Sequence, residues 1–420
     1  MLSTLKNAWK IPDLKKKLLY TLAMLIIFRL GTAIPVPGID KMKLASLFTA
    51  DEGLIGFFNL MSGGAFKNFT IFALGISPYI TASIIVNLLQ IAIPALERLA
   101  KEGETGRKKL AQMTRYGTVI LALIQAFGIS AGFFRQAFIN YNTTSIAISV
   151  ITLTAGTAFL MYLGEKINEN GIGNGISLFI FAGIIARVPD ATIDIVVRLF
   201  GGDIGIFSVI IFLIVAIVII MGVIYIQQGA RKVPVQYAKR VVGRKMYGGH
   251  NTHIPLKVNQ AGVIPVIFAI SLLMFPITIA QFWPASGFYL WIKTYFNSTT
   301  ALYNVLNGLL IIFFTYFYTS VIFNPIEVAD NMKKNGGFIP GIRPGRPTSE
   351  YLTRTMNRLT MAGAVFLALI ATLPNVILAM GELQIGFGGT SLLIVVGVSL
   401  ETMKQIEAQM VMRHYQGFLK

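Results

Sequence analysis

The sequence predicts an all-α polytopic membrane protein with ten transmembrane helices. Its 420 residues are 55% hydrophobic and only 13% charged, and the mean hydropathy is +0.68. A soluble domain of this size has no use for so much apolar surface. The apolar residues also fall into runs separated by polar loops, and most runs approach the roughly 20 residues that a bilayer-spanning helix needs. We therefore expect the chain to cross a membrane repeatedly.

Ten apolar runs follow one another along the chain, and the fifth is short and follows the glycine-rich run GIGNGIS. The runs are 18–34, 70–93, 114–134, 146–163, 176–188, 204–226, 262–282, 302–323, 359–380 and 390–403. An even number of spans places both termini on one side of the membrane. Most of the 36 Lys and Arg residues lie on that side, so the positive-inside rule predicts that both termini are cytoplasmic.

A short apolar segment at residues 57–66 precedes the second span and is about half the length needed to cross a bilayer. It includes small residues that let backbones approach closely: Ser62, Gly63, Gly64 and Ala65. The span that follows carries Gly75 and Pro78 near its start. Irregular backbone is costly in lipid unless it is buried in protein or lines a cavity. We therefore expect a half-helix that acts as the movable stopper of a pore.

Two loops on the basic side, at about 227–259 and 324–353, are longer than orientation requires. The first alternates apolar and polar residues around Val235, and Gly248-Gly249 offers a turn, so it predicts a β-hairpin. Prolines and glycines stiffen the second. Rigid basic protrusions suit docking to ribosomal RNA or an acidic protein face, and binding to anionic lipid head groups stays open. The candidate docking residues are Arg231, Lys239, Arg240, Arg343 and Arg346.

The sequence carries no signature of an enzyme, a metal site or a cofactor site. It has no cysteine, no phosphate-binding GxxxxGK[ST] run and no HExxH motif, and His250 and His253 lack a third ligand. The alternative of a secondary solute transporter with inverted repeats is disfavoured, because its spans would need carboxylates or histidines. The clear intramembrane charge is Arg29, which we expect to face a neighbour's carbonyls or an acidic partner near the outer leaflet.

Isoleucines recur in four spans: Ile76 and Ile80 one turn apart, Ile180 and Ile184 at the same spacing, Ile264 and Ile267 around Pro265, and Ile394. Such positions commonly face lipid or pack between helices. A ring of them at one depth would instead form a dry gasket that excludes ions while a polypeptide slides through. Their spacing alone does not decide between these interpretations.

Ordered motifs along essentially the whole chain closely resemble the SecY family of protein-conducting channels. They are TIFALGISPYITASIIV, YLGEKINENGIGNGISLFIFAGI, RLGTAIPVPGID, RKVPVQYAKRV, NQAGVIPVIFAISLLMFP, PGIRPGRPT and GFGGTSLLIVVGV. The resemblance implies two inverted, pseudo-symmetric five-helix halves, residues 1–190 and 191–420. It also implies a passive channel that translocates unfolded secretory polypeptides and releases transmembrane segments into lipid through a lateral gate. No cofactor is implied.

The resemblance also assigns roles to residues and implies partners. The pore ring would be Ile76, Ile80, Ile180, Ile184, Ile267 and Ile394. The plug would include Phe57, Asn59, Met61, Ser62, Gly63, Gly64 and Ala65. The lateral gate, between spans two and three on one side and seven and eight on the other, would include Ser83, Asn87, Gln125, Ser271 and Phe275. The partners would be the SecE and SecG subunits, the SecA motor ATPase, the ribosome, signal sequences, nascent polypeptides and membrane lipids.

Overall fold

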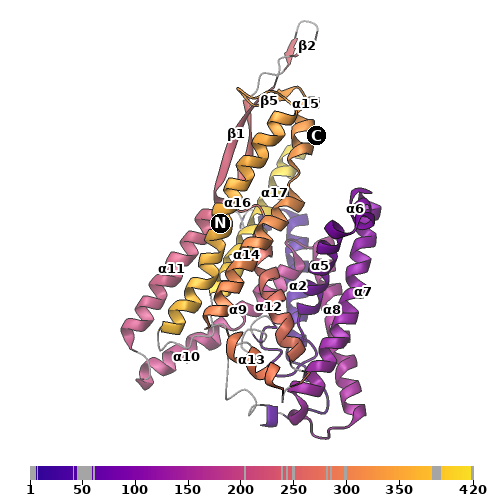
Figure 1. The fold of residues 1–420 in the computed structure, drawn as a ribbon, viewed down its shortest axis with the longest axis vertical. Coiled ribbons are helices and arrows are strands. Elements are labelled where there is room, and N and C mark those ends of the chain that lie inside the picture. Colours follow the sequence, from indigo (N-terminus) through magenta and orange to yellow (C-terminus); the bar gives the residue numbers. More distant parts are fainter. Residues whose placement is uncertain are drawn as a thin grey trace.

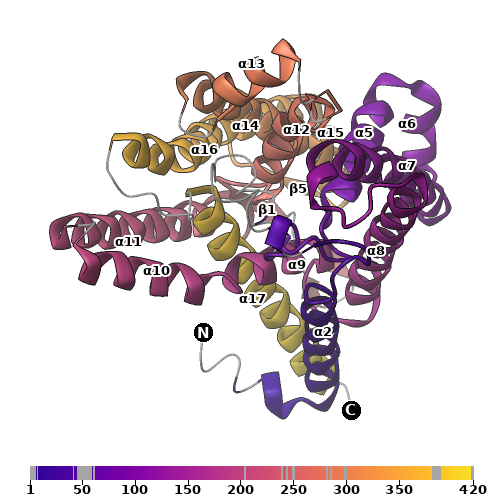
Figure 2. The ribbon, with the colours of Figure 1, turned by 90° about the horizontal axis from the view of Figure 1, so that it is seen from below.

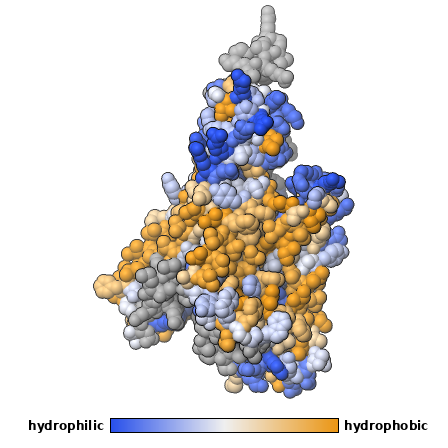
Figure 3. Space-filling model, in the orientation of Figure 1, coloured by the Kyte–Doolittle hydropathy of each residue, from blue (hydrophilic) through white to orange (hydrophobic). Residues whose placement is uncertain are grey.

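The computed structural model describes residues 6, 8–40, 42–44, 59, 62–202, 205–237, 240–242, 245–247, 251–280, 282–283, 286–297, 300–380 and 389–417. They form a helical bundle with a small sheet at one end (Figure 1). Hydrophobic side chains form a band around the middle of the visible face, and hydrophilic ones gather towards the ends (Figure 3). This is the surface expected of a protein whose middle lies in a bilayer.

Each predicted span coincides with one helix, which confirms the ten-helix prediction. The first five are α2 (Pro12–Gly31), α5 (Ser77–Ala92), α7 (Glu104–Gly128), α8 (Thr143–Asn170) and α9 (Gly175–Ile185). The last five are α11 (Ile206–Gln228), α12 (Ile264–Ala280), α14 (Ala301–Ile322), α16 (Arg346–Met380) and α17 (Gly389–Gly417). Among the described residues, six helical stretches are individually long and apolar enough to span a membrane.

Shorter helices continue or connect these spans. Pro94 ends α5, because the residue before a proline is driven to an extended conformation, and α6 (Pro94–Lys101) leaves it at a bend of 102°. If this bent pair is one span, the spanning stretches in the described chain number seven. The other short helices are α10 (Val188–Gly201), which continues the short fifth span, α13 (Gly287–Tyr295), α15 (Pro325–Lys334) and the single turns Ile129–Phe133 and Arg135–Ala137.

Helices α5, α7 and α8 lie on one side of the bundle and α11, α14 and α16 on the other, while α2 and α17, from the two ends of the chain, lie beside each other (Figure 2). Helices α5, α7 and α8 pack in succession, and α14 packs against both α12 and α16. Contacts between the sides come from α12 with α5 and α7, and from α17 with α9. This arrangement brings the second, fifth, seventh and tenth spans together near the middle of the bundle.

The second span begins later than predicted. Residues 70–76 precede the helix, which starts at Ser77 because Gly75 adopts a left-handed conformation (φ +56°) and Pro78 suits the first turn of a helix. This irregular stretch is buried or partly buried, as an irregular backbone at membrane depth requires. It pairs with the loop after α2, where the Val36 N–H donates to the Phe69 carbonyl at 3.0 Å.

The two basic loops form a single unit, which the sequence did not predict. Strand β1 (Ala230–Tyr237) pairs antiparallel with β4 (Asn251–Lys257), as the hairpin prediction requires, and also with β5 (Gly337–Phe338) from the second loop. A small core of its own holds the unit together: Val233, Val235, Leu256, Met332, Ile339, Leu352 and Met356. We call β1, β4, β5, α15 and the start of α16 the basic protrusion.

The hairpin reverses at a different point from the predicted turn. At its tip, β2 (Arg240–Val242) pairs with β3 (Lys245–Tyr247), and Val242 lies opposite Lys245. The chain has therefore already reversed before Gly248-Gly249, which lie outside the described residues.

Candidate functional site

Six isoleucines from four spans are buried in the main hydrophobic core of the bundle, together with many other side chains. Each is at most 7% exposed, and they come from α5 and the residue before it, α9, α12 and α17. They are Ile76, Ile80, Ile180, Ile184, Ile267 and Ile394. All six positions proposed as a ring are therefore buried in this core, and their arrangement as a ring stays a prediction.

Ser62 and Gly63 of the plug segment, residues 57–66, pack against backbone beside two of these isoleucines. A Cβ atom placed on Gly63 would lie 3.0 Å from the Cα atom of Gly183, which precedes Ile184. A Cβ atom placed on Gly75, which precedes Ile76, would lie 3.7 Å from the Cα atom of Ser62. Two positions of the segment therefore contact the immediate neighbours of two clustered isoleucines.

The described part of the plug segment differs from a regular half-helix. Asn59 is helical, but residues 62–69 form successive turns, and Phe57 and Met61 lie outside the described residues. The Asn59 side-chain oxygen accepts from the Lys67 N–H at 3.0 Å, and its carbonyl accepts from the Gly64 N–H at 2.8 Å. The left-handed Gly63 and Gly64 (φ +65° and +90°) interrupt the helical backbone and explain the turns.

Arg29 reaches the plug segment from the last turn of α2. Its Nη1 atom donates to the Gly63 carbonyl at 2.7 Å and lies 3.4 Å from the Thr32 hydroxyl. The prediction that this residue faces a neighbour's carbonyl is confirmed.

The turns that follow the plug segment are packed among aromatic rings. Phe69 is fully buried and has a positive φ of 42°, a conformation that is strained for a residue with a side chain. Its ring lies 4.2 Å from that of Phe134, which also packs against Phe66 at 5.3 Å. The surrounding rings hold Phe69 in this conformation.

Helix α12 packs against both α5 and α7, along the seam where the lateral gate is predicted. Gln125 of α7 and Ser271 of α12 are buried, Ser83 and Asn87 of α5 are partly buried, and Phe275 is 39% exposed. Near one end of the seam, the Phe282 ring lies so close to Gly128 that a Cβ atom there would be 2.6 Å from it. The five residues predicted for the lateral gate belong to the helices of this seam, and the Phe282–Gly128 contact lies near one end of it.

A family model described as SecY matches residues 70–403 of the chain. The chain is 49% identical to the protein translocase subunit SecY of Halalkalibacterium halodurans over 436 residues, which cover all of both chains. The chain belongs to the SecY family. Members of this family are channel subunits rather than enzymes, as predicted.

Solved SecY and Sec61 structures share the fold. The chain matches a SecY structure whose plug domain is described as stabilising the closed state of the translocation channel and maintaining a membrane seal. The TM-score is 0.67 at 22% identity, covering 94% of this chain and 92% of the other. It also matches Sec61 in a canine ribosome–channel complex from the endoplasmic reticulum, with a TM-score of 0.64 at 20% identity, covering 94% and 93%. These likenesses show that the SecY fold extends over nearly the whole chain.

Three of the five proposed docking residues lie exposed on the basic protrusion. Arg231 on β1, Arg343 before α16 and Arg346 at its start are all exposed, and Arg346 also pairs with Glu350, with Nε and Oε1 3.0 Å apart. Arg240 is the first residue of β2, near the hairpin tip, and Lys239 lies outside the described residues. Because β5 joins β1, the two loops present their charges as one surface.

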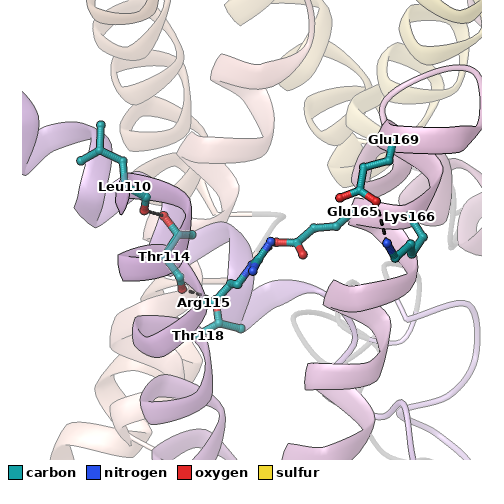
Figure 4. Close-up of polar contacts among 7 residues, drawn as sticks. All are labelled: Leu110, Thr114, Arg115, Thr118, Glu165, Lys166 and Glu169. Carbon is teal, nitrogen blue, oxygen red and sulfur yellow. Dashed lines mark hydrogen bonds and ion pairs between the residues drawn. The ribbon is translucent and has the colours of Figure 1, made fainter. Parts of the chain in front are cut away.

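Sequence reasoning missed an ion pair between two spans, since its partners lie far apart in the chain. Arg115 extends from α7 to Glu165 on α8, with Nε and Oε1 2.7 Å apart (Figure 4). Nearby, the hydroxyls of Thr114 and Thr118 donate to carbonyls one turn earlier on their own helix, at 3.1 and 2.7 Å. These buried hydroxyls are satisfied locally and form no further polar site. Within the described parts of the chain, no cluster of side chains suits a metal ion.

Proposed function

We propose that this chain is the passive protein-conducting channel of a protein translocase. It passes unfolded secretory polypeptides across the cytoplasmic membrane and releases transmembrane segments into lipid. One observation carries the proposal: the plug segment packs on Gly75 and Gly183, beside two of the six clustered isoleucines. A small-residue stopper seated on an apolar constriction blocks ions at rest and can be displaced by an entering chain.

The isoleucines act as a ring around the translocating polypeptide. Their side chains offer no hydrogen-bonding groups, so the ring holds neither ions nor the polar groups of a passing chain. They come from both halves of the chain, residues 1–190 and 191–420, so separation of the halves widens the ring. Because the channel is passive, partner proteins supply the free energy that drives the polypeptide through it.

The lateral gate opens along the seam of α12 with α5 and α7. Gln125 and Ser271 are buried polar residues assigned to this seam, and polar side chains contribute less hydrophobic stabilisation than apolar ones of similar size. An apolar signal sequence competes for such a seam and then partitions into lipid.

The basic protrusion docks the ribosome and the SecA motor, and both termini are cytoplasmic. In support, Sec61 channels are found in complexes with ribosomes. Residues from both ends of the chain, Leu14 and Ile406, also share a small core, so both ends lie on one side of the bundle. SecE clamps the two halves, and SecG is a peripheral subunit.

Removal of Asn59–Ala65 tests the stopper. In membrane vesicles that carry only the variant channel, the resting leak of small ions should rise, because nothing then covers the ring. A matched deletion of the exposed Asn140–Asn142 loop should leave the leak at the parent level. An unchanged leak in the plug deletion would refute the stopper.

A further inference from the structure

Arg29 is a charged side chain within an apolar span, where charge is costly and needs a partner. Among the described residues, no carboxylate lies within ion-pair distance of it. Its partners are neutral oxygens: the Gly63 carbonyl at 2.7 Å and, more weakly, the Thr32 hydroxyl at 3.4 Å. The Thr32 hydroxyl itself donates to the Arg29 carbonyl at 2.7 Å, which orients it towards the arginine. Of the two contacts that the guanidinium makes, the one to the plug segment is the shorter.

The acceptor lies at the point where the plug segment meets α9. Gly63 has its backbone beside Gly183 on one side and the Arg29 guanidinium on the other: a Cβ atom there would lie 3.0 Å from the first and 3.5 Å from the second. The plug segment is thus held between α2, through a charged donor, and α9, through backbone contact. Movement of Gly63 away from α9 also moves its carbonyl relative to Arg29.

We propose that Arg29 is a positioning residue that holds the plug in its closed seat through the Gly63 carbonyl. The inference rests on the proposed function, since it assumes that the segment is a stopper. A hydrogen bond with a charged donor is stronger than a neutral one, yet one such bond is weak enough to break when a polypeptide enters. Its loss should shift the balance between closed and displaced plugs about tenfold towards displacement.

The chain contains no cysteine, so the position of the plug can be followed through one introduced thiol. Ser62 is 2% exposed, and a Ser62→Cys thiol should react slowly with a membrane-impermeant maleimide. Adding Arg29→Leu should raise this rate about tenfold. Arg29→Lys, which keeps a charged donor, should give a smaller increase.

Two matched controls separate positioning from general loosening. Ser149→Cys reports on a fully buried site in α8, and its rate should not change when Arg29→Leu is added. Arg135→Leu removes an exposed arginine that stacks on Tyr141, and it should leave the Ser62→Cys rate unchanged. An equal rise at Ser149→Cys, an equal rise with Arg135→Leu, or no rise at Ser62→Cys would each overturn the proposal.

The plug deletion distinguishes failure of this inference from failure of the proposed function. If the Asn59–Ala65 deletion leaks ions but Arg29→Leu leaves Ser62→Cys unreactive, the stopper stands and the role of Arg29 is refuted. If the deletion does not leak, the stopper and the role of Arg29 fall together.

Discussion

Two neighbouring glycines of the plug segment differ in what surrounds them. Gly63 and Gly64 both have positive φ angles, of +65° and +90°, so any other residue is strained at either position. Only Gly63 also faces a backbone: an added Cβ atom would lie 3.0 Å from the Gly183 Cα atom, whereas at Gly64 no atom lies within 4 Å. The pair therefore separates backbone strain from contact with α9.

We predict that Gly63→Ala raises the resting ion leak more than Gly64→Ala does. Both variants carry the cost of a positive φ, but Gly63→Ala adds a clash that destabilises the seated plug by about 1 kcal/mol. Conductance of single channels in planar bilayers, recorded without substrate, measures the difference. Equal leaks from the two variants would mean that contact with α9 does not hold the plug.

At the scale of elements, α8 supports the irregular backbone that precedes α5. Gly156 lies so close to this stretch that a Cβ atom would be 1.9 Å from the Ile71 carbonyl oxygen. Because both partners are backbone, neither can rotate away. The glycine in α8 is thus the reason that an irregular segment can run through the bundle at this depth.

We predict that Gly156→Ala lowers the free energy of unfolding by about 1–3 kcal/mol, because α8 must move away from Ile71. Urea unfolding of the purified channel in detergent, followed by tryptophan fluorescence, measures this change. Gly287→Ala is the matched control, since no atom lies within 4 Å of a Cβ atom there. If both variants unfold at the same urea concentration, the packing of α8 on Ile71 is not critical.

At the scale of the whole molecule, the ten helices can be predicted from the sequence because each span needs a long apolar run. The plug and Arg29 can also be recognised in the sequence, because the plug has half the length of a span and Arg29 is a charge within an apolar run. Motif resemblance then selects six isoleucines that periodicity cannot distinguish from packing residues. All six share one buried cluster.

The features that the sequence did not predict depend on contacts between residues far apart in the chain. Strand β5 has only two residues, Gly337 and Phe338, and no alternating pattern, so its pairing with β1 has no local signal. The Arg115–Glu165 ion pair and the seat of Gly63 on Gly183 likewise join separate elements. The turns after Ser62 escaped prediction because short apolar runs with glycine suit a half-helix equally well.

The central claim is that a polypeptide in transit passes through the isoleucine cluster. Its most direct test is a disulfide between Ile80→Cys and a single cysteine in a stalled secretory substrate. The matched control is Ile151→Cys in α8, at a residue that is 65% exposed. We predict a crosslink from Ile80→Cys and none from Ile151→Cys. If Ile80→Cys gives no crosslink while Ile184→Cys does, the ring assignment of Ile80 is wrong. If neither isoleucine position crosslinks, or if Ile151→Cys crosslinks equally, the polypeptide does not pass through this cluster.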